Sequence, residues 1–497
     1  MGNPLFARKS HEALMEELRD HSRLKRVLGP VQLTSLGVGA IIGTGIFVLV
    51  GVAAHDCTGP ALMLSFVVAG LTCVFAALCY AEFASMVPVA GSAYTYAYAT
   101  LGELFAWIIG WDLVLEYAVA ASTVAHGWSH YFQDFITFFH LHVPYHYTNA
   151  PFDYDSTLGK LALTGTWFDL PAVVIALLVT AILVKGIRES ASFNAGIVIL
   201  KLAIVFLVIG VGARYVNPAN WKPFAPFGFA GFAFFGHTLI GQTGPTGAPL
   251  GMLAGAAIVF FAYIGFDSIS THAEEAKNPS RDVPIGIMTS LILCTVLYIA
   301  MAAVLTGMVP YNQINIDAPV SEAFRQVGLP WAQFLVSIGA IAGITSVLLV
   351  MMLSQARIFL AMARDGLLPP KFFAAVHEKF RTPWKSTILT GVCVAIMAAF
   401  LPLRVLAELV NIGTLLAFVI VCAAVMIMRR THPHVHRPFR APFGPIVPIL
   451  GILSCLMLMF SLPAANWVRL FVWLVIGLVI YFTYGRRHSR VNHPQSR

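Results

Sequence analysis

The sequence predicts an all-α polytopic membrane protein with about twelve transmembrane helices. Of its 497 residues, 58% are hydrophobic and only 11% are charged, and the mean hydropathy is +0.79. So few charged residues cannot cover the surface of a soluble domain of this length. A glycine cluster interrupts the first hydrophobic run, and a glycine and an aspartate interrupt the sixth. Interrupted spans predict backbone that lines a cavity inside the membrane.

Twelve hydrophobic runs approach the length of about 20 residues that a membrane-spanning helix needs. Their expected positions are 31–54, 61–84, 101–126, 169–187, 193–213, 251–272, 285–308, 331–361, 384–402, 406–428, 446–462 and 466–484. The first and sixth runs are corresponding members of two five-helix halves. The predicted divisions are an N-terminal arm (1–30), a first five-helix repeat (31–213), an extracytoplasmic loop (214–250), a second five-helix repeat (251–428), two additional helices (429–484) and a basic tail (485–497).

Lysine and arginine are distributed unevenly between the alternate connecting segments. With a cytoplasmic N-terminus, 24 of the 31 Lys and Arg fall in cytoplasmic segments, 6 fall outside, and only Lys201 falls deep in a span. Positive residues accumulate on the cytoplasmic side of membrane proteins. We therefore expect both termini in the cytoplasm. The formal net charge of +8 follows from this topology and does not indicate nucleic-acid binding.

The centre of the first run is rich in glycine. Four glycines fall within nine residues there, namely Gly37, Gly39, Gly43 and Gly45. Each weakens a helix by roughly 1 kcal/mol relative to alanine, which favours an unwound segment at membrane depth. Close helix packing would explain the same glycines. A dinucleotide-binding loop is excluded, because the spacing is wrong and no strand precedes it.

The sixth run contains the second interruption. The segment Phe260–Ser268 places Gly265 and Asp267 near the middle of the span, and the acidic segment Glu274–Pro279 closes it. Two interrupted spans at matched positions favour unwinding over simple packing. They are also typical of a transport site between inverted repeats.

Three further ionisable residues within the predicted spans are candidates for function, because such residues are costly inside a membrane. Asp112 and Glu116 in the third run are four residues apart and therefore share one helix face. We expect them in a transport pathway, or, for Asp112 especially, in a pairing near the membrane interface. Lys201 in the fifth run could occupy the place of a bound sodium ion if helix carbonyls pointed at it. The alternative is a static ion pair with Glu116 or Asp267.

The eighth run is long, with small residues in its outer half that permit close approach to the first run. Met351 and Met352 follow these small residues. We expect both to fill the core, or one of them to line a pocket. The segment Arg364–Pro369 ends this run with a turn.

Histidines are frequent in two predicted loops, which raises the question of a metal site. They are His126, His130, His140, His142 and His146 around the loop after the third run, and His432, His434 and His436 before the eleventh. These histidines have no regular ligand spacing and no supporting Cys or Asp pattern. We expect solvated loops and predict neither a metal site nor a cofactor.

Three of these motifs together resemble a known family, the amino acid–polyamine–organocation (APC) superfamily. They are Gly37–Phe47, Phe260–Ser268 with Glu274–Pro279, and Arg364–Pro369. Within the superfamily the chain is most similar to the cationic amino acid transporter subfamily and its bacterial homologues, over about residues 28–484. The resemblance implies a LeuT-like fold of 5+5 inverted repeats with two further C-terminal helices. The chain departs from the family in its insert near 241–247 and in lacking two C-terminal spans of the animal members.

The resemblance also implies a substrate site built mainly from backbone. The N–H groups of Thr44, Gly45 and Ile46 would face the substrate α-carboxylate, as the positive end of a half-helix should. Carbonyls of both broken spans would face the ammonium group. The substrate-binding residues implied or considered are Ile41, Gly43, Thr44, Gly45, Ile46, Phe261, Ala262, Ile264, Glu116, Asp267 and Met351. Lys201 matches the lysine of proton-coupled members, and Glu116 is the second candidate for coupling.

We therefore expect a secondary active amino acid transporter in a bacterial cytoplasmic membrane. The predicted reaction is H⁺-coupled symport of cationic or small neutral L-amino acids by alternating access. An exchanger is the nearest alternative, and a transport-inactive amino acid sensor is a further one. No Ser/His, metal or nucleotide constellation converges, so we do not expect an enzyme. The expected partners are the amino acid, protons and the lipid bilayer, without nucleic acid.

Overall fold

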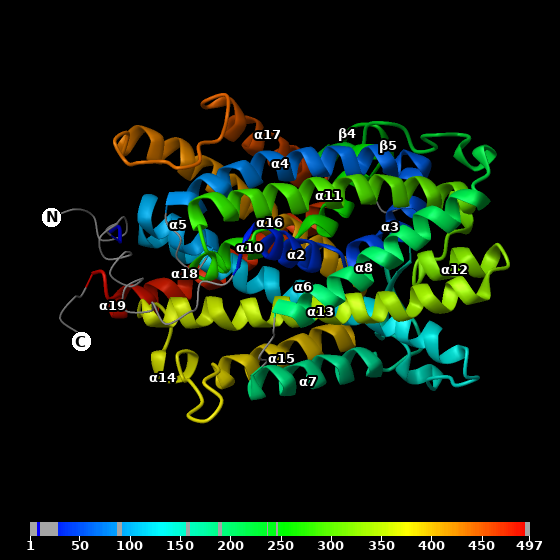
Figure 1. Cartoon of the computed structure of the whole chain (residues 1–497), viewed down its shortest axis with the longest axis horizontal. Coiled ribbons are helices and arrows are strands. Elements are labelled where there is room, and N and C mark those ends of the chain that lie inside the picture. The colour runs from blue at the N-terminus through cyan, green and yellow to red at the C-terminus, as the bar shows by residue number, and fades with distance from the viewer. Residues whose placement is uncertain are drawn as a thin grey trace.

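The structure of the chain is a computed structural model (Figure 1). It describes residues 7–9, 28–86, 92–155, 160–186, 191–235, 237–244 and 247–492. Long helices run side by side along the longest axis of the molecule (Figure 1). The predicted arm over residues 1–30 lies largely outside the described residues, as does the end of the basic tail.

The first half of the chain forms one broken and several long helices. Its helices are α2 (Pro30–Ile41), η2 (Gly45–Leu49), α3 (Val50–Ala53), η3 (Ala54–Thr58), η4 (Gly59–Ala61), α4 (Leu62–Met86), α5 (Ser92–Thr100), α6 (Glu103–Thr137), η5 (Tyr145–Tyr147), α7 (Leu170–Lys185), α8 (Ala191–Gly212), η6 (Ala213–Tyr215) and η7 (Pro218–Trp221). Of these, η2 and η3 are π-helical turns that continue the first span beyond its break.

The second half repeats the alternation of broken and long helices. Its helices are α9 (Met252–Val259), η8 (Phe260–Tyr263), α10 (Ser268–Thr271), η9 (Ala273–Glu275), α11 (Pro279–Met308), η10 (Tyr311–Gln313), α12 (Pro319–Gln326), α13 (Pro330–Arg364), α14 (Pro370–Phe373), α15 (Trp384–Phe400), α16 (Leu403–Thr431), α17 (Ile446–Phe460), α18 (Ala464–Ile480), η11 (Tyr481–Gly485) and α19 (Arg486–His488).

Two connecting segments that were expected to be loops contain short antiparallel hairpins. The strands are β1 (Phe152–Asp155), β2 (Lys160–Leu163), β3 (Phe232–Phe234), β4 (His237–Ile240), β5 (Gln242–Thr243) and β6 (Pro249–Leu250). They pair as β1–β2, β3–β4 and β5–β6. The fold is therefore predominantly helical, with the hairpins confined to the connections.

The described helices have the composition of a multi-pass membrane protein. Eight are long and apolar enough to cross a membrane, and four shorter apolar helices of 10–17 residues accompany them. The protein is therefore a polytopic membrane protein. The count of twelve spans and the internal repeat remain predictions.

Both predicted interruptions are confirmed. The first span breaks after α2, where Ile42 is extended with φ −74° and ψ 104°. The sixth breaks after η8, where Ile264 is extended and Gly265 has φ +116°. Packing holds the two breaks in the interior, since α2 contacts α8 and α11, and η8 contacts α4, α16 and η2.

Segments near the two ends of the chain meet at the start of α6. Glu103 is fully buried and accepts hydrogen bonds from Tyr98, Tyr481, Ser489 and Asn492. Its backbone N–H donates to the carbonyl of residue 7 at 3.0 Å. We call this set of contacts the terminal clasp. It joins the first and last described segments on one side of the molecule.

Asp365, in the turn after α13, extends the terminal clasp. Its carboxylate accepts hydrogen bonds from Lys9 (2.8 Å) and Tyr94 (2.7 Å). Its carbonyl accepts from the N–H of Arg490 at 3.1 Å. Gly366 follows with φ +83°, and a Cβ there would overlap the carbonyl oxygen of His488.

Replacing Gly366 with alanine should destabilise the protein by about 1 kcal/mol or more, because φ is positive and a backbone atom blocks the new methyl group. Thermal unfolding of the purified protein in detergent measures this effect. Gly210→Ala is the matched control, since Gly210 lies within α8 with nothing within 4 Å of an added Cβ. Equal melting temperatures for the two variants would contradict the prediction.

Candidate functional site

The break in the first span exposes backbone N–H groups. Among the described residues, the N–H groups of Gly43, Thr44 and Gly45 donate no backbone hydrogen bond. The carbonyl of Gly43 accepts from the N–H groups of Ile46 and Phe47, both at 3.2 Å. The Ile46 N–H therefore donates within the turn itself, and its contact with a substrate stays a prediction. The N–H groups of Gly43, Thr44 and Gly45 lie at the start of a helix, where the partial positive charge favours binding of an anion.

Thr44 adds a hydroxyl group to this helix start. Its side chain is 1% exposed, and its Oγ1 has no hydrogen-bond partner among the described residues. It packs against Gly127 of α6, where a Cβ would lie 3.2 Å from Oγ1. An unpartnered buried hydroxyl beside free N–H groups is suited to an incoming polar ligand.

The two broken spans touch each other through glycine. A Cβ on Gly265 would lie 2.8 Å from the carbonyl oxygen of Ala40, and one on Gly45 would overlap the Cα of Ala262. Only glycine allows the backbones to come this close, and Gly265 also needs its positive φ. These contacts bring Gly45 and Ala262, two predicted site residues, directly together.

Tyr298 of α11 bridges the carbonyls of both breaks, and the sequence analysis did not find it. Its hydroxyl lies 2.9 Å from the carbonyl oxygen of Ile41 and 3.0 Å from that of Ala262. The hydroxyl has one hydrogen to donate, whereas each carbonyl has two lone pairs. Acceptor capacity is therefore left at Ile41 and Ala262 for another donor. The carbonyl of Phe261, by contrast, accepts from the Ile264 N–H at 3.2 Å.

Lys201 of α8 reaches the carbonyl end of α2. Its Nζ donates to the carbonyls of Gly39 (2.5 Å) and Ile42 (2.9 Å), and the side chain is fully buried. Gly343 of α13 leaves room for its stem, with an added Cβ 3.3 Å from the Lys201 Cγ. Within the described part of the chain, no ion pair joins Lys201 to Glu116 or Asp267. The ammonium group therefore binds where helix carbonyls lack their usual donors.

Three buried carboxyl groups lie along α6 and the sixth break. Asp112, Glu116 and Asp267 are each 1% exposed. Tyr117 donates to Oδ2 of Asp267 at 2.9 Å, and Glu116 lies within the electrostatic reach of both aspartates. Several of their oxygen atoms lack a hydrogen-bond partner among the described residues, namely both of Asp112, Oε1 of Glu116 and Oδ1 of Asp267. These atoms can accept a proton or a cation.

Met351 of α13 is buried next to the first break. Val347 lies one turn earlier on the same helix face, and its Cγ2 would be 2.8 Å from a Cβ on Gly43. Met351 therefore continues an apolar surface that begins at the break. The approach of the eighth run to the first, predicted from small residues, occurs at Gly43 and Val347.

Two histidines are not where the sequence analysis expected them. His126 and His130 lie on α6, which continues to Thr137 instead of ending near residue 126. The side chain of His126 is 2% exposed and that of His130 is 8% exposed. The expectation that they belong to a solvated loop is wrong. Polar residues end the hydrophobic run near residue 126, although the helix itself continues to Thr137.

A comparison with known protein families gives one decisive match. The family model described as amino acid permease matches residues 28–484. The chain belongs to the amino acid permease family. The resemblance to the APC superfamily is thereby confirmed.

Individual relatives cover nearly the whole chain. It is 47% identical to the methylthioribose transporter of Bacillus subtilis (strain 168), over 98% of this chain and 99% of the relative. It is 47% identical to the branched-chain amino acid permease BcaP of the same organism, over 99% and 100%. It is 32% identical to the vacuolar cationic amino acid transporter 4 of Arabidopsis thaliana, over 95% and 93%. These relatives are transporters and not enzymes.

Removing the Tyr298 hydroxyl should weaken substrate binding, because this hydroxyl contacts one carbonyl of each break. In Tyr298→Phe we expect a loss of about 1–3 kcal/mol, or roughly 5- to 100-fold in affinity. Binding of a panel of labelled amino acids to the purified protein measures this loss. Tyr263→Phe is the matched control, since its buried hydroxyl donates to the Phe66 carbonyl at 2.8 Å. Unchanged or tighter binding in Tyr298→Phe would show that the hydroxyl does not position the site.

Proposed function

We propose that the protein is a proton-coupled symporter of L-amino acids. The observation that carries the proposal is the position of Lys201, whose ammonium group caps the carbonyls of Gly39 and Ile42 at the break in the first span. An ammonium group there can satisfy these carbonyls as a bound metal cation could. Unlike a metal cation, it can also release a proton.

The proposed coupling follows from the cost of a buried charge. An ammonium group inside a membrane protein is retained only while carbonyls or anions compensate it. In the protonated state Lys201 holds α8 against α2. When the proton leaves, the two hydrogen bonds weaken and α2 is released from α8. Movement of α2 then becomes linked to the proton, which is the requirement for alternating access driven by H⁺.

The proposed binding mode places the amino acid between the two breaks. Its carboxylate accepts from the N–H groups of Gly43, Thr44 and Gly45 and from the Thr44 hydroxyl. Its ammonium group donates to the remaining lone pairs at Ile41 and Ala262. The support for this mode is the set of unused donors and acceptors at the two broken helices.

Two features bear on the side chain of the substrate. Val347 and Met351 provide an apolar surface next to the first break, which favours small or branched neutral amino acids. BcaP, whose name specifies branched-chain amino acids, is 47% identical to this chain. The unpartnered oxygen atoms of Glu116 and Asp267 favour a cationic side chain instead. We propose neutral amino acids as the main substrates, with cationic amino acids as the second class.

The proposed location is the cytoplasmic membrane of a bacterium, with both termini inside. The concentration of Lys and Arg in alternate segments supports this orientation. The terminal clasp, which places both described chain ends on one side, agrees with an even number of spans.

Uptake into proteoliposomes under an imposed inward proton gradient tests the proposal. The wild-type protein should concentrate its substrate, whereas Lys201→Gln and Lys201→Arg should not accumulate it above the level reached without a gradient. Gln carries no charge to cycle, and Arg does not release its proton. Lys185→Gln, at the exposed end of α7, is the matched control and should accumulate normally.

The same experiment separates the alternatives. Accumulation by both Lys201 variants would mean that coupling lies elsewhere, with Glu116 the next candidate. Substrate exchange without any response to the proton gradient in the wild type would identify an exchanger. Binding without uptake or exchange would identify a sensor.

Substitution of Met351 tests the proposed apolar surface. Met351→Ser should weaken the binding of leucine or alanine by about tenfold, because a buried apolar contact is lost, and should leave arginine binding nearly unchanged. Competition assays with the three amino acids measure the ranking. Met352→Ser, equally buried but turned away from Val347, is the control. An unchanged ranking in Met351→Ser excludes this residue from the pocket.

A further inference from the structure

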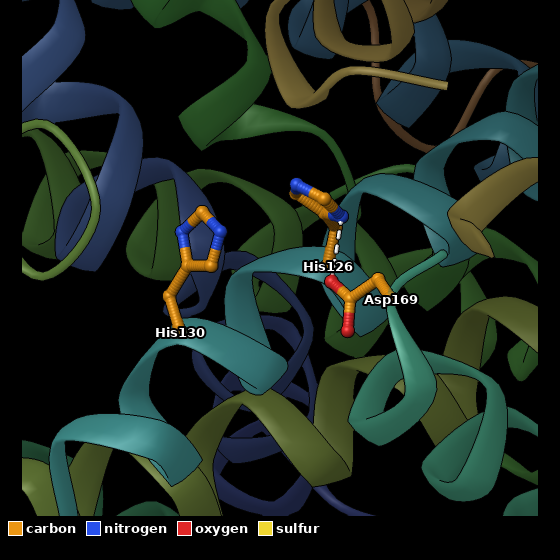
Figure 2. Close-up of side chains that lie close together, drawn as sticks. All are labelled: His126, His130 and Asp169. Atoms are coloured by element: carbon orange, nitrogen blue, oxygen red, sulfur yellow. Dashed lines mark ion pairs between the residues drawn. The ribbon is translucent and has the colours of Figure 1, made fainter. Parts of the chain in front are cut away.

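A second group of polar side chains lies where α6 meets the start of α7. It consists of His126 and His130, one helical turn apart on α6, and Asp169, the N-cap residue of α7 (Figure 2). Each residue offers one possible ligand atom, and these atoms all lie within 4.8 Å of one another. We call this group the His–His–Asp cluster.

The cluster contains polar atoms that the described protein leaves unsatisfied. Nδ1 of His126 lies 2.9 Å from Oδ2 of Asp169, and the two imidazole rings have centroids 4.8 Å apart. Nevertheless Nδ1 of His126, Nδ1 of His130 and Oδ2 of Asp169 are buried without a hydrogen bond of good geometry. Possible ligand atoms that lie within 4.8 Å of one another, on side chains whose buried atoms lack hydrogen bonds among the described residues, are suited to a shared cation.

Asp169 is held in place for this role by its other oxygen. Oδ1 accepts from the Ser129 hydroxyl at 2.6 Å and from the Ala172 N–H at 3.0 Å. The Asp169 N–H donates to the carbonyl of Ala399 at 3.2 Å. Partners of this kind fix the orientation of a metal-binding carboxylate and leave the second oxygen for the ion.

A polar cavity borders the cluster at His130. The cavity has a volume of about 270 Å³, and His130 lies in its wall with Asp134, Asp317 and Glu322. The Asp317 side chain is 57% exposed, and its Oδ1 lies 3.4 Å from Nδ1 of His130. An acidic lining raises the local concentration of cations. Water in the cavity can supply the remaining ligands of an ion at His130.

We propose that His126, His130 and Asp169 bind a divalent transition-metal ion such as Zn²⁺. Two histidines at positions i and i+4 present their rings on one helix face, and imidazole with a carboxylate is a ligand set that Zn²⁺ accepts. The ion would join α6 to the start of α7. The three ligands include neither Lys201 nor any residue of the two breaks, so the proposal does not depend on the proposed transport reaction.

Zinc titration of the purified full-length protein tests the proposal, with any affinity tag removed before calorimetry. We expect one Zn²⁺ ion per chain in the wild type. His130→Gln should bind at least about tenfold more weakly, because a ligand is lost. His142→Gln, on an exposed loop, is the matched control and should bind as the wild type does. Co²⁺ added to the wild type should give the visible absorption of a nitrogen-ligated ion, absent in His130→Gln.

Thermal unfolding distinguishes a lost site from a lost fold. Without metal, His130→Gln should melt close to the wild type, because this side chain borders the cavity. Zinc should raise the melting temperature of the wild type and of His142→Gln, but not that of His130→Gln. Absence of a stoichiometric site in the wild type, or equal zinc affinity in wild type and His130→Gln, would overturn the proposal. In either case the 2.9 Å contact would be a structural histidine–aspartate pair only.

Discussion

The structure depends on one constraint, that no backbone polar group can remain unsatisfied at membrane depth unless something else binds it. Two spans are interrupted, after Ile41 and after Tyr263, and each interruption leaves backbone groups without their helical partners. Each break is tolerated because a neighbouring helix supplies a donor. Lys201 of α8 binds the carbonyls of the first break, and Tyr298 of α11 binds one carbonyl of each. The arrangement of the surrounding helices follows from the need to bring these two side chains to one place.

The two donors differ in a way that matters for mechanism. The Tyr298 hydroxyl is neutral, so it can connect the two breaks throughout a cycle without any change of charge. The Lys201 ammonium group carries a charge whose stability depends on the carbonyls that it binds. Among the buried carboxyl groups, Asp267 accepts a hydrogen bond from Tyr117 of α6. In the proposed coupling, a constant interaction of Tyr298 and a variable one of Lys201 therefore meet at the first break.

Local sequence was sufficient to predict the breaks, because Gly43, Gly45 and Gly265 weaken a helix wherever it is packed. It also predicted the burial of Lys201, but it left the partner of the ammonium group open between helix carbonyls and a carboxylate. It could not identify Tyr298, because which buried tyrosine reaches a given carbonyl depends on how α11 packs. It also missed the His–His–Asp cluster. The four-residue spacing of His126 and His130 was visible, but the ligand from Asp169 comes from a different helix, and the end of α6 was placed too early.

The terminal clasp has a consequence for the order of assembly during biosynthesis. Glu103 is translated early, yet three of its hydrogen-bond donors, Tyr481, Ser489 and Asn492, follow it by 378, 386 and 389 residues. A buried carboxylate that lacks most of its donors is costly, so the start of α6 cannot reach its final packing until these residues have left the ribosome. Insertion of the helices is therefore separated in time from completion of the bundle. A nascent chain that stalls before Tyr481 lacks all three donors and remains open at the end where α5, α6 and α13 meet.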